Sequence, residues 1–202
     1  MKRIGLAIGA VVAVAGAALV SITTVRVDSA VEAKPARRAV QPPAAPVRAA
    51  FVEVPGQGLA VPVLGHARSA IRDSWGDARG GGRGHRGLDM MAAEGTPVVA
   101  VVAGEVEKLF DSRLGGTTLY LRSGDKRWQY YYAHLAGYTA GLREGMKVRA
   151  GQVLGYVGDT GDAGKGNHHL HFSAARMEPG ARWWQGKDVN PYPLLAEPKA
   201  RR

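Results

Sequence analysis

Hydrophobic and polar positions divide the chain into three stretches of different character. The first begins with the basic residues Lys2 and Arg3, and from Ile4 to Val25 it is mainly apolar and carries no charged residue. As a helix rising ~1.5 Å per residue, this run would be about 33 Å long, enough to cross the hydrocarbon core of a bilayer. Residues 1–33 are therefore predicted to form a signal anchor or a signal peptide.

The length of the apolar run favours an uncleaved anchor, since a cleaved signal peptide usually has a shorter apolar core. The sequences DSA and VEA nevertheless offer cleavage sites near Ala30 and Ala33, so both outcomes stay open. Lys2 and Arg3 predict that the N-terminus stays in the cytoplasm and that the rest of the chain lies outside. We expect an exported protein of the periplasm or cell envelope, held in the inner membrane by its N-terminal segment.

The second stretch, residues 34–55, is rich in Pro, Ala and Arg and contains the run KPARRAVQPPAAPVR. Sequences of this kind adopt extended, semi-rigid conformations, so the stretch is predicted to be a spacer between the membrane and a folded domain. Residues 196–202 are predicted to be a basic tail.

From about Gly56 the pattern changes to short β-branched runs that are separated by Gly, Asp and Pro. No amphipathic helix can be recognised between Leu59 and Pro193. This pattern predicts an all-β domain over residues 56–195. Strands are expected at 96–106, 117–122, 128–134, 152–157 and 169–174, and one more is expected to begin near Leu88.

Two segments of this domain resemble each other. The sequences EGTPVVA (Glu94–Ala100) and EGMKVRA (Glu144–Ala150) match at Glu, Gly, Val and Ala. A duplicated β unit would explain the match, and so would chance, because a turn of this composition before a strand is common.

The composition limits the chemistry that this domain can perform. With 46% hydrophobic and 22% charged residues, the chain is not disordered as a whole. Cysteine is absent, which excludes a disulfide framework, thiolate metal ligands and a cysteine nucleophile. Any metal site must therefore use histidine and carboxylate ligands.

The formal net charge of +10 raises the question of a nucleic-acid partner. The basic residues are spread along the chain, however, and several lie in the predicted spacer and tail. No basic helix interleaved with aromatic residues can be recognised, so no nucleic-acid partner is expected. A basic surface suits other anionic polymers equally well, and the bacterial cell wall is one of them.

Three of the six histidines lie within the sequence GNHHLHF. Because alternate residues of a strand share a face, His169 and His171 are predicted to point to one side, and His168 and Leu170 to the other. This geometry supplies one half of a candidate site.

The sequence RGHRGLDMMA supplies the other half, with His85 and Asp89 four residues apart. Gly84 and Gly87 disfavour a helix here and favour a loop that enters the strand near Leu88. One Asp and two His can form a three-ligand zinc site that leaves one position open for water, which is typical of catalytic zinc sites.

A third motif, WQYYYAHL, ends in a histidine followed by leucine. Strand alternation places Trp128, Tyr130, Tyr132 and His134 on one face. Such a histidine can be a hydrogen-bonded core residue, but beside a zinc site it becomes a candidate acid/base or oxyanion donor.

The motifs HRGLD, YYYAHL and HLHF, in this order and at these separations, resemble those of the lysostaphin-like (LytM-type) zinc metalloendopeptidases. The sequences GTPVVAVVAGEV and GQVLGYVGDTG belong to the same pattern, which runs from about Ser74 to Phe172. The resemblance implies a compact, barrel-like antiparallel β domain with a duplicated motif. It also implies hydrolysis of peptide bonds in the cross-links of bacterial peptidoglycan, whose stem peptides would be the partner of this chain.

The resemblance further implies a role for each motif residue. His85, Asp89 and His171 would bind one Zn²⁺ per chain. His134 and His169 would be the catalytic pair beside the metal, with the division of labour between them left open. His168 departs from the family pattern, and strand alternation turns it away from the metal.

Two other functions are compatible with such a domain. A non-enzymatic regulator that binds and activates another wall hydrolase is the main alternative, but regulators of this kind have typically lost zinc ligands, whereas all five positions are filled here. A structural or carrier zinc module is weaker, since a closed zinc site needs a fourth ligand. The scissile bond is expected to depend on the loops 111–116 and 158–166, and the sequence leaves the oligomeric state open.

Overall fold

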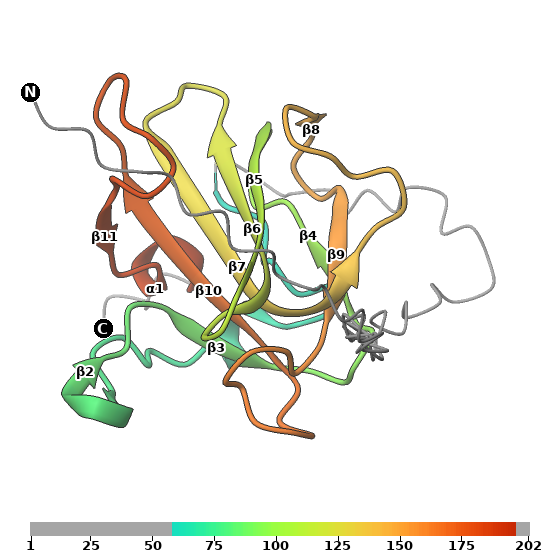
Figure 1. Cartoon of the computed structure of the whole chain (residues 1–202), viewed down its shortest axis with the longest axis vertical. Coiled ribbons are helices and arrows are strands. Elements are labelled where there is room, and N and C mark those ends of the chain that lie inside the picture. Colours follow the sequence, from blue (N-terminus) through green and yellow to red (C-terminus); the bar gives the residue numbers. More distant parts are fainter. Residues whose placement is uncertain (1–57, 197–202) are drawn as a thin grey trace, which may run out of the picture. The chain divides into compact units, whose positions relative to one another are not determined.

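The computed structural model of the protein describes residues 58–196 (Figure 1). The predicted N-terminal segment 1–33, the spacer 34–55 and nearly all of the tail lie outside the described residues. Within the described range, no helix is long and apolar enough to cross a membrane. The helices there are η1 (Arg68–Ala70), η2 (Gly80–Gly82) and α1 (Tyr192–Leu195).

Strands supply the remaining regular structure of the described residues. They are β1 (Ala78–Arg79), β2 (Arg83–Gly84), β3 (Leu88–Met91), β4 (Pro97–Val99), β5 (Gly104–Ser112), β6 (Gly116–Ser123), β7 (Trp128–Tyr138), β8 (Lys147–Val148), β9 (Val153–Val157), β10 (His169–Arg176) and β11 (Lys187–Val189). The all-β prediction is confirmed, and the strand expected near Leu88 begins at that residue. The expected strand 96–106 is wrong as a single element, because β4 ends at Val99 and β5 begins at Gly104.

Nine of these strands form one antiparallel sheet (Figure 1). Its main path runs β11-β10-β7-β6-β5-β8, and β4 joins through β9. One edge of β10 pairs first with β3 and then with β11, while the other pairs with β7. The short hairpin of β1 and β2 carries η2 and forms a separate two-stranded sheet.

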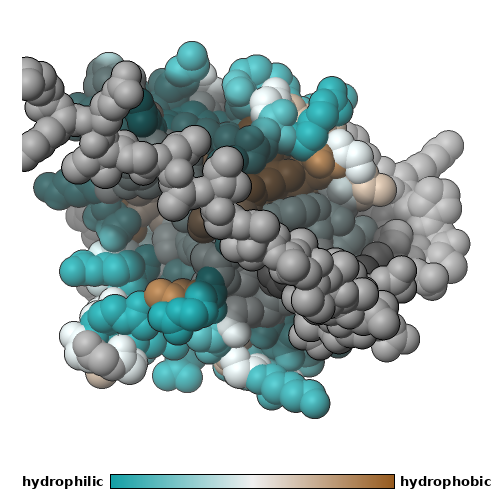
Figure 2. All heavy atoms as spheres, viewed as in Figure 1, coloured by the Kyte–Doolittle hydropathy of each residue, from teal (hydrophilic) through white to brown (hydrophobic). Residues whose placement is uncertain are grey.

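The hydrophobic core lies against one face of the large sheet. Alternate side chains of the three central strands are buried there: Leu119 and Leu121 of β6, Tyr130 and Tyr132 of β7, and Leu170, Phe172 and Ala174 of β10. The intervening side chains, such as Tyr120, Tyr131 and Ser173, line a hollow on the outer face. On the face seen in Figure 2, hydrophilic residues predominate and hydrophobic residues form patches between them.

The two segments that resemble each other in sequence also adopt the same local structure. Each begins with a turn in which glycine has a positive φ, 80° for Gly95 and 79° for Gly145, and continues into a short strand, β4 or β8. The match therefore reflects a shared turn that requires glycine at its second residue.

Candidate metal centre and active site

Donor atoms of His85, Asp89 and His171 converge beside β3 and β10, and all of them lie within 4.8 Å of one another. Nδ1 of His171 is 3.1 Å from Oδ1 of Asp89 and 2.9 Å from Nε2 of His85. The same carboxylate oxygen is 3.2 Å from Nε2 of His85. The fold thus brings together the three residues that were predicted to form a metal site.

Strand register accounts for two of these positions. Asp89 and His171 are directly opposite each other in the antiparallel pairing of β3 with β10. Side chains that are opposite in such a pair leave the same face with Cβ atoms about 4.5–5.5 Å apart. His85 approaches from the loop between β2 and β3, as the glycines around it indicated.

Gly87 makes room for the ring of His171 in the three-donor cluster. A Cβ atom at this position would lie 2.6 Å from the carbonyl oxygen of Phe172 and 2.7 Å from ring atoms of His171. Because these distances are shorter than real Cβ contacts, only glycine allows the imidazole of His171 to pack over this backbone.

Hydrogen bonds orient both imidazole rings. Nδ1 of His85 lies 2.8 Å from the carbonyl oxygen of Ser74, and Nε2 of His171 lies 3.0 Å from Oγ of Ser173 on β10. Ser74 also accepts a hydrogen bond at Oγ from the backbone N–H of Asp89, over 3.3 Å. These contacts direct Nε2 of His85 and Nδ1 of His171 toward Asp89, as the outer hydrogen bonds of metal-binding histidines do.

The carboxylate of Asp89 stays ionised. Burial alone would raise its pKa, but hydrogen bonds from His171, His85 and Arg79 outweigh that effect and hold the pKa well below its usual range. Arg79 pairs with the second carboxylate oxygen, Oδ2, and leaves Oδ1 to the two imidazoles.

This donor set fits a divalent cation. In the tautomers that a cation would select, Nδ1 of His85 donates to Ser74 and Nε2 of His171 donates to Ser173, and neither ring donates to Asp89. The nitrogens that face each other at 2.9 Å then both present lone pairs. A carboxylate oxygen lies beside them, so three electron pairs converge on one point. Two imidazoles and a carboxylate are ligands that zinc prefers.

His134 and His169 lie beside this cluster, with ring centroids 4.8 Å apart. Nε2 of His169 is 3.9 Å from Oδ1 of Asp89, and the ring of His134 is 6.1 Å from that of His171. These distances place both rings next to the point where the three donors converge.

Each of the two rings contacts a backbone carbonyl through Nδ1. His134 contacts that of Thr160 at 2.7 Å, and His169 contacts that of Asn167 at 2.8 Å. Burial lowers the pKa of His134, so its ring favours the neutral form that can accept a proton.

The predicted face of His134 is wrong. Tyr130 and Tyr132 are buried in the core, whereas His134 lines the cleft that contains His85, Asp89 and His171. The cause is an irregularity in β7, where pairing with β10 ends at Ala133, pairing with β9 begins at Leu135, and His134 between them has a φ of 60°. This local break in the alternation turns the imidazole out of the core and into the site.

A cleft of about 490 Å³ contains both groups of histidines. Its walls include Leu114 and Gly115 from one loop and Asp162 and Ala163 from another. These belong to the two loops, 111–116 and 158–166, that were expected to border the substrate groove.

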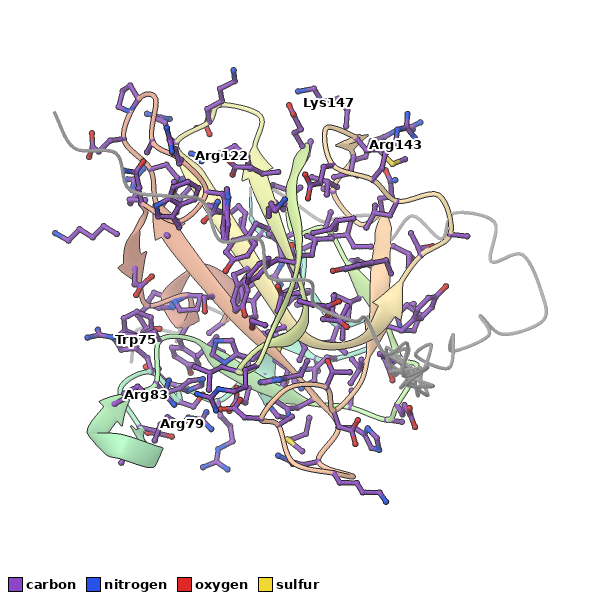
Figure 3. All side chains as sticks on the ribbon, viewed as in Figure 1. Trp75, Arg79, Arg83, Arg122, Arg143 and Lys147 are labelled. Carbon is purple, nitrogen blue, oxygen red and sulfur yellow. The ribbon has the colours of Figure 1, made fainter. Side chains whose placement is uncertain are left out.

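The β1–β2 hairpin supplies a basic wall of the same cleft. Arg79 and Arg83 line it from this hairpin, and in Figure 3 they lie at the opposite end of the view from Arg122 and Lys147. The cleft is therefore bordered by positive charge on the side from which Arg79 reaches Asp89.

Several residues of the site were missed by the sequence analysis. Ser173 could have been found, since it follows His171 by two positions on the same strand face. Ser74 and Thr160 lie within the recognised pattern and Arg79 lies between its first residues, but their roles could not be predicted, because tertiary contacts bring them to the site.

His168 lies outside the cluster, as strand alternation indicated. It is not among the residues that line the cleft, and its Nε2 is 4.0 Å from a carboxylate oxygen of Glu94. Leu170 is buried in the core on the opposite face from His169 and His171.

Comparison with known proteins identifies the domain that carries this site. The family model described as Peptidase family M23 matches residues 83–191, a range that contains all five predicted site residues. The chain belongs to peptidase family M23. The predicted relationship to lysostaphin-like peptidases is thereby confirmed.

Individual relatives agree with this assignment. The chain is 37% identical over 133 residues to the L-Ala--D-Glu endopeptidase of Bacillus subtilis, a match that covers 62% of the chain and 39% of the relative. It is 33% identical over 90 residues to the peptidoglycan DD-endopeptidase ShyC of Vibrio cholerae, covering 45% of the chain and 20% of the relative. The chain thus spans less than half the length of these relatives.

A solved structure shows the same fold. The catalytic domain of the antimicrobial peptidase lysostaphin from Staphylococcus simulans matches with a TM-score of 0.52 and 30% identity. The match covers 62% of this chain and 90% of that domain.

Proposed function

We propose that this M23 domain is a zinc-dependent endopeptidase that hydrolyses peptide bonds in peptidoglycan cross-links. The observation that carries the proposal is the cleft itself, in which His85, Asp89 and His171 form a three-donor cluster and His134 and His169 lie beside it. Three protein ligands leave one position open, which is typical of catalytic zinc sites.

The three donors would hold one zinc ion per chain. When bound, zinc supplies a Lewis acid that polarises a carbonyl group and lowers the pKa of water toward about 7. Arg79 pairs with Asp89 and holds its carboxylate in place, while Ser74 and Ser173 fix the rings of His85 and His171.

The other two histidines would move the protons of the reaction. Nδ1 of each is engaged with a backbone carbonyl, so Nε2 is the nitrogen available to substrate. A neutral ring can accept a proton at Nε2 as a general base and later return it to the departing amine, while a protonated ring can donate its Nε2–H to the developing oxyanion. The structure is compatible with either division of these roles between His134 and His169.

The substrate class is proposed from the relatives, which include a peptidoglycan DD-endopeptidase. Stem peptides of the cell wall lie outside the cytoplasm, in agreement with the predicted export of this chain. All five site positions carry the expected residue, and for this reason an enzyme is favoured over a regulator that activates another hydrolase.

Digestion of purified peptidoglycan tests the proposal. The full-length chain in detergent should release soluble peptide fragments, and mass analysis should identify the bond that is cut. Removal of metal by a chelator should stop the release, and added Zn²⁺ should restore it. A chain loaded with zinc that releases no fragment from any peptidoglycan would contradict the proposal.

A further inference from the structure

A row of aromatic rings leads from the candidate active site along the outer face of the sheet. Tyr131 approaches His171 edge-on, with ring centroids 6.0 Å apart, and Tyr120 lies 4.6 Å from Tyr131. Trp183 follows at 4.9 Å from Tyr120, and Trp184 at 5.2 Å from Trp183. Phe110 packs against Trp183 from the side, at 5.6 Å. We call Phe110, Tyr120, Trp183 and Trp184 the aromatic shelf.

The two tryptophans are presented by a tight turn between β10 and β11. The N–H of Gln185 donates to the carbonyl of Arg182 over 2.9 Å, and the side-chain oxygen of Gln185 accepts from the N–H of Arg182 over 2.8 Å. The turn is tied to the sheet because the guanidinium of Arg122 donates to the carbonyl of Ala181 over 3.1 Å. The shelf is therefore held in shape before any ligand arrives.

The shelf exposes more apolar surface than a structural role requires. Trp184 and Phe110 are 56% and 41% exposed, and they are two of the three large hydrophobic residues that are exposed among residues 58–196. The guanidinium of Arg182 lies over the ring of Trp184, 5.3 Å from its centroid, yet more than half of this side chain stays exposed. Exposed aromatic surface of this kind is available to a ligand.

The shelf is continuous with the catalytic cleft. Three residues of the shelf, Tyr120, Trp183 and Trp184, line a hollow of about 330 Å³. This hollow shares Arg86, Tyr131 and His171 with the cleft. The hollow also contains polar groups on Ser173 and Asp188. An apolar floor with a few polar groups at its margin is typical of a site for a small amphipathic ligand.

We propose that the aromatic shelf binds an N-acetylated hexosamine of the peptidoglycan glycan strand, and this assignment rests on the proposed function. A pyranose ring has a C–H face that packs on an aromatic ring and a rim of hydroxyl and amide groups that Asp188 and Arg86 can bind. In peptidoglycan each stem peptide is covalently attached to a sugar. A peptide in the cleft therefore carries its sugar toward the adjoining hollow.

The test uses the full-length chain in detergent and the tetramer of N-acetylglucosamine as a glycan probe. Binding is followed by ligand-observed NMR for the wild type, Trp184→Leu and Trp184→Phe. Leucine keeps an apolar side chain but lacks an aromatic face, whereas phenylalanine keeps the face. We expect saturable binding by the wild type, a loss of about tenfold in affinity for Trp184→Leu, and near-wild-type affinity for Trp184→Phe.

A kinetic comparison tests the same shelf during turnover. Cross-linked peptides are offered with their sugars attached and with their sugars removed, and kcat/KM is measured for both. The wild type should prefer the sugar-bearing substrate, and Trp184→Leu should bring the ratio of the two values close to one. Matching far-UV circular dichroism and thermal unfolding midpoints of the variants and the wild type show that the fold is kept.

The two proposals can fail separately. Wild-type protein that binds the tetramer through Trp184 but cuts neither substrate supports the shelf as a glycan site and contradicts the proposed function. Wild-type protein that cuts both substrates equally well and shows no saturable binding of the tetramer overturns the shelf assignment and leaves the peptidase intact. Equal binding by the wild type and Trp184→Leu overturns it as well.

Discussion

At the residue scale, each imidazole of the site has one nitrogen engaged by the protein and one nitrogen directed toward the cleft. His85, His134 and His169 contact backbone carbonyls through Nδ1, whereas His171 contacts Ser173 through Nε2. His171 is engaged through the other nitrogen because Ser173, two residues further along the same face of β10, reaches the far side of the ring. When the engaged nitrogen carries the proton, the other nitrogen presents a lone pair where a metal or a proton is needed.

Loss of a ligand should remove the metal. Asp89→Ala and His171→Ala should each purify without zinc, because two remaining donors do not hold the ion against solvent. The control is His168→Ala, which removes a neighbouring imidazole outside the cluster and should keep zinc near one per chain. Metal analysis of the purified proteins makes the measurement. If only His168→Ala lost zinc, His168 and not its neighbours would face the metal. The register of this strand would then differ by one residue, and the ligand assignment would be wrong.

At the element scale, the pairing of β3 with β10 places Asp89 beside His171 in the three-donor cluster, and the irregularity in β7 brings His134 into the same cleft. Alternation within β10 could be predicted from the sequence, since His169, His171 and Leu170 follow a simple period of two. The position of His134 outside the core could not be predicted from the sequence. It depends on a change of strand partner, because β7 pairs with β10 up to Ala133 and with β9 from Leu135. It also depends on the hydrogen bond that the backbone N–H of His134 donates to the carbonyl of Gly115. Contacts of this kind are tertiary and leave no pattern in a single strand.

The glycine before β3 allows a test of this arrangement. Gly87→Ala should weaken zinc binding by about 10–100-fold, because the new methyl group displaces the ring of His171 from its position over the backbone. Gly84→Ala is the matched control in the same motif, since its Cβ would meet no atom closer than 3.8 Å. Zinc titration of the two variants makes the comparison. Equal affinity in both would show that the ring of His171 does not require this close approach.

At the scale of the whole molecule, the large sheet has the hydrophobic core on one face and the candidate site on the other. Leu119, Tyr132 and Phe172 face the core, whereas Tyr131 and His171 line the outer hollow and the cleft. The all-β class could be predicted because β-branched runs and glycine turns are local signals. The division of residues 96–106 into β4 and β5 could not be predicted, because residues 100–103, which separate the two strands, continue an apolar run without a break in the pattern.

We further predict that the domain folds without the N-terminal stretch. A chain that lacks Met1–Arg48 should be soluble without detergent, bind zinc and keep its activity, because the hydrophobic core of the described residues is built between Val63 and Leu195. Circular dichroism and thermal unfolding of the shortened and full-length proteins test this expectation. A shortened chain that is unfolded while the full-length protein is folded would place the domain boundary elsewhere.

The most direct test of the central claim compares turnover with metal retention at His134 and His169. His134→Ala and His169→Ala should keep one zinc per chain, since neither side chain belongs to the three-donor cluster. Both should release peptide fragments from purified peptidoglycan about 10²–10⁴-fold more slowly than the wild type, because a proton carrier or an oxyanion donor is lost. His168→Ala is the control and should cut at the wild-type rate. Zinc-loaded His134→Ala and His169→Ala proteins that cut as fast as the wild type would remove both histidines from the mechanism and contradict the account.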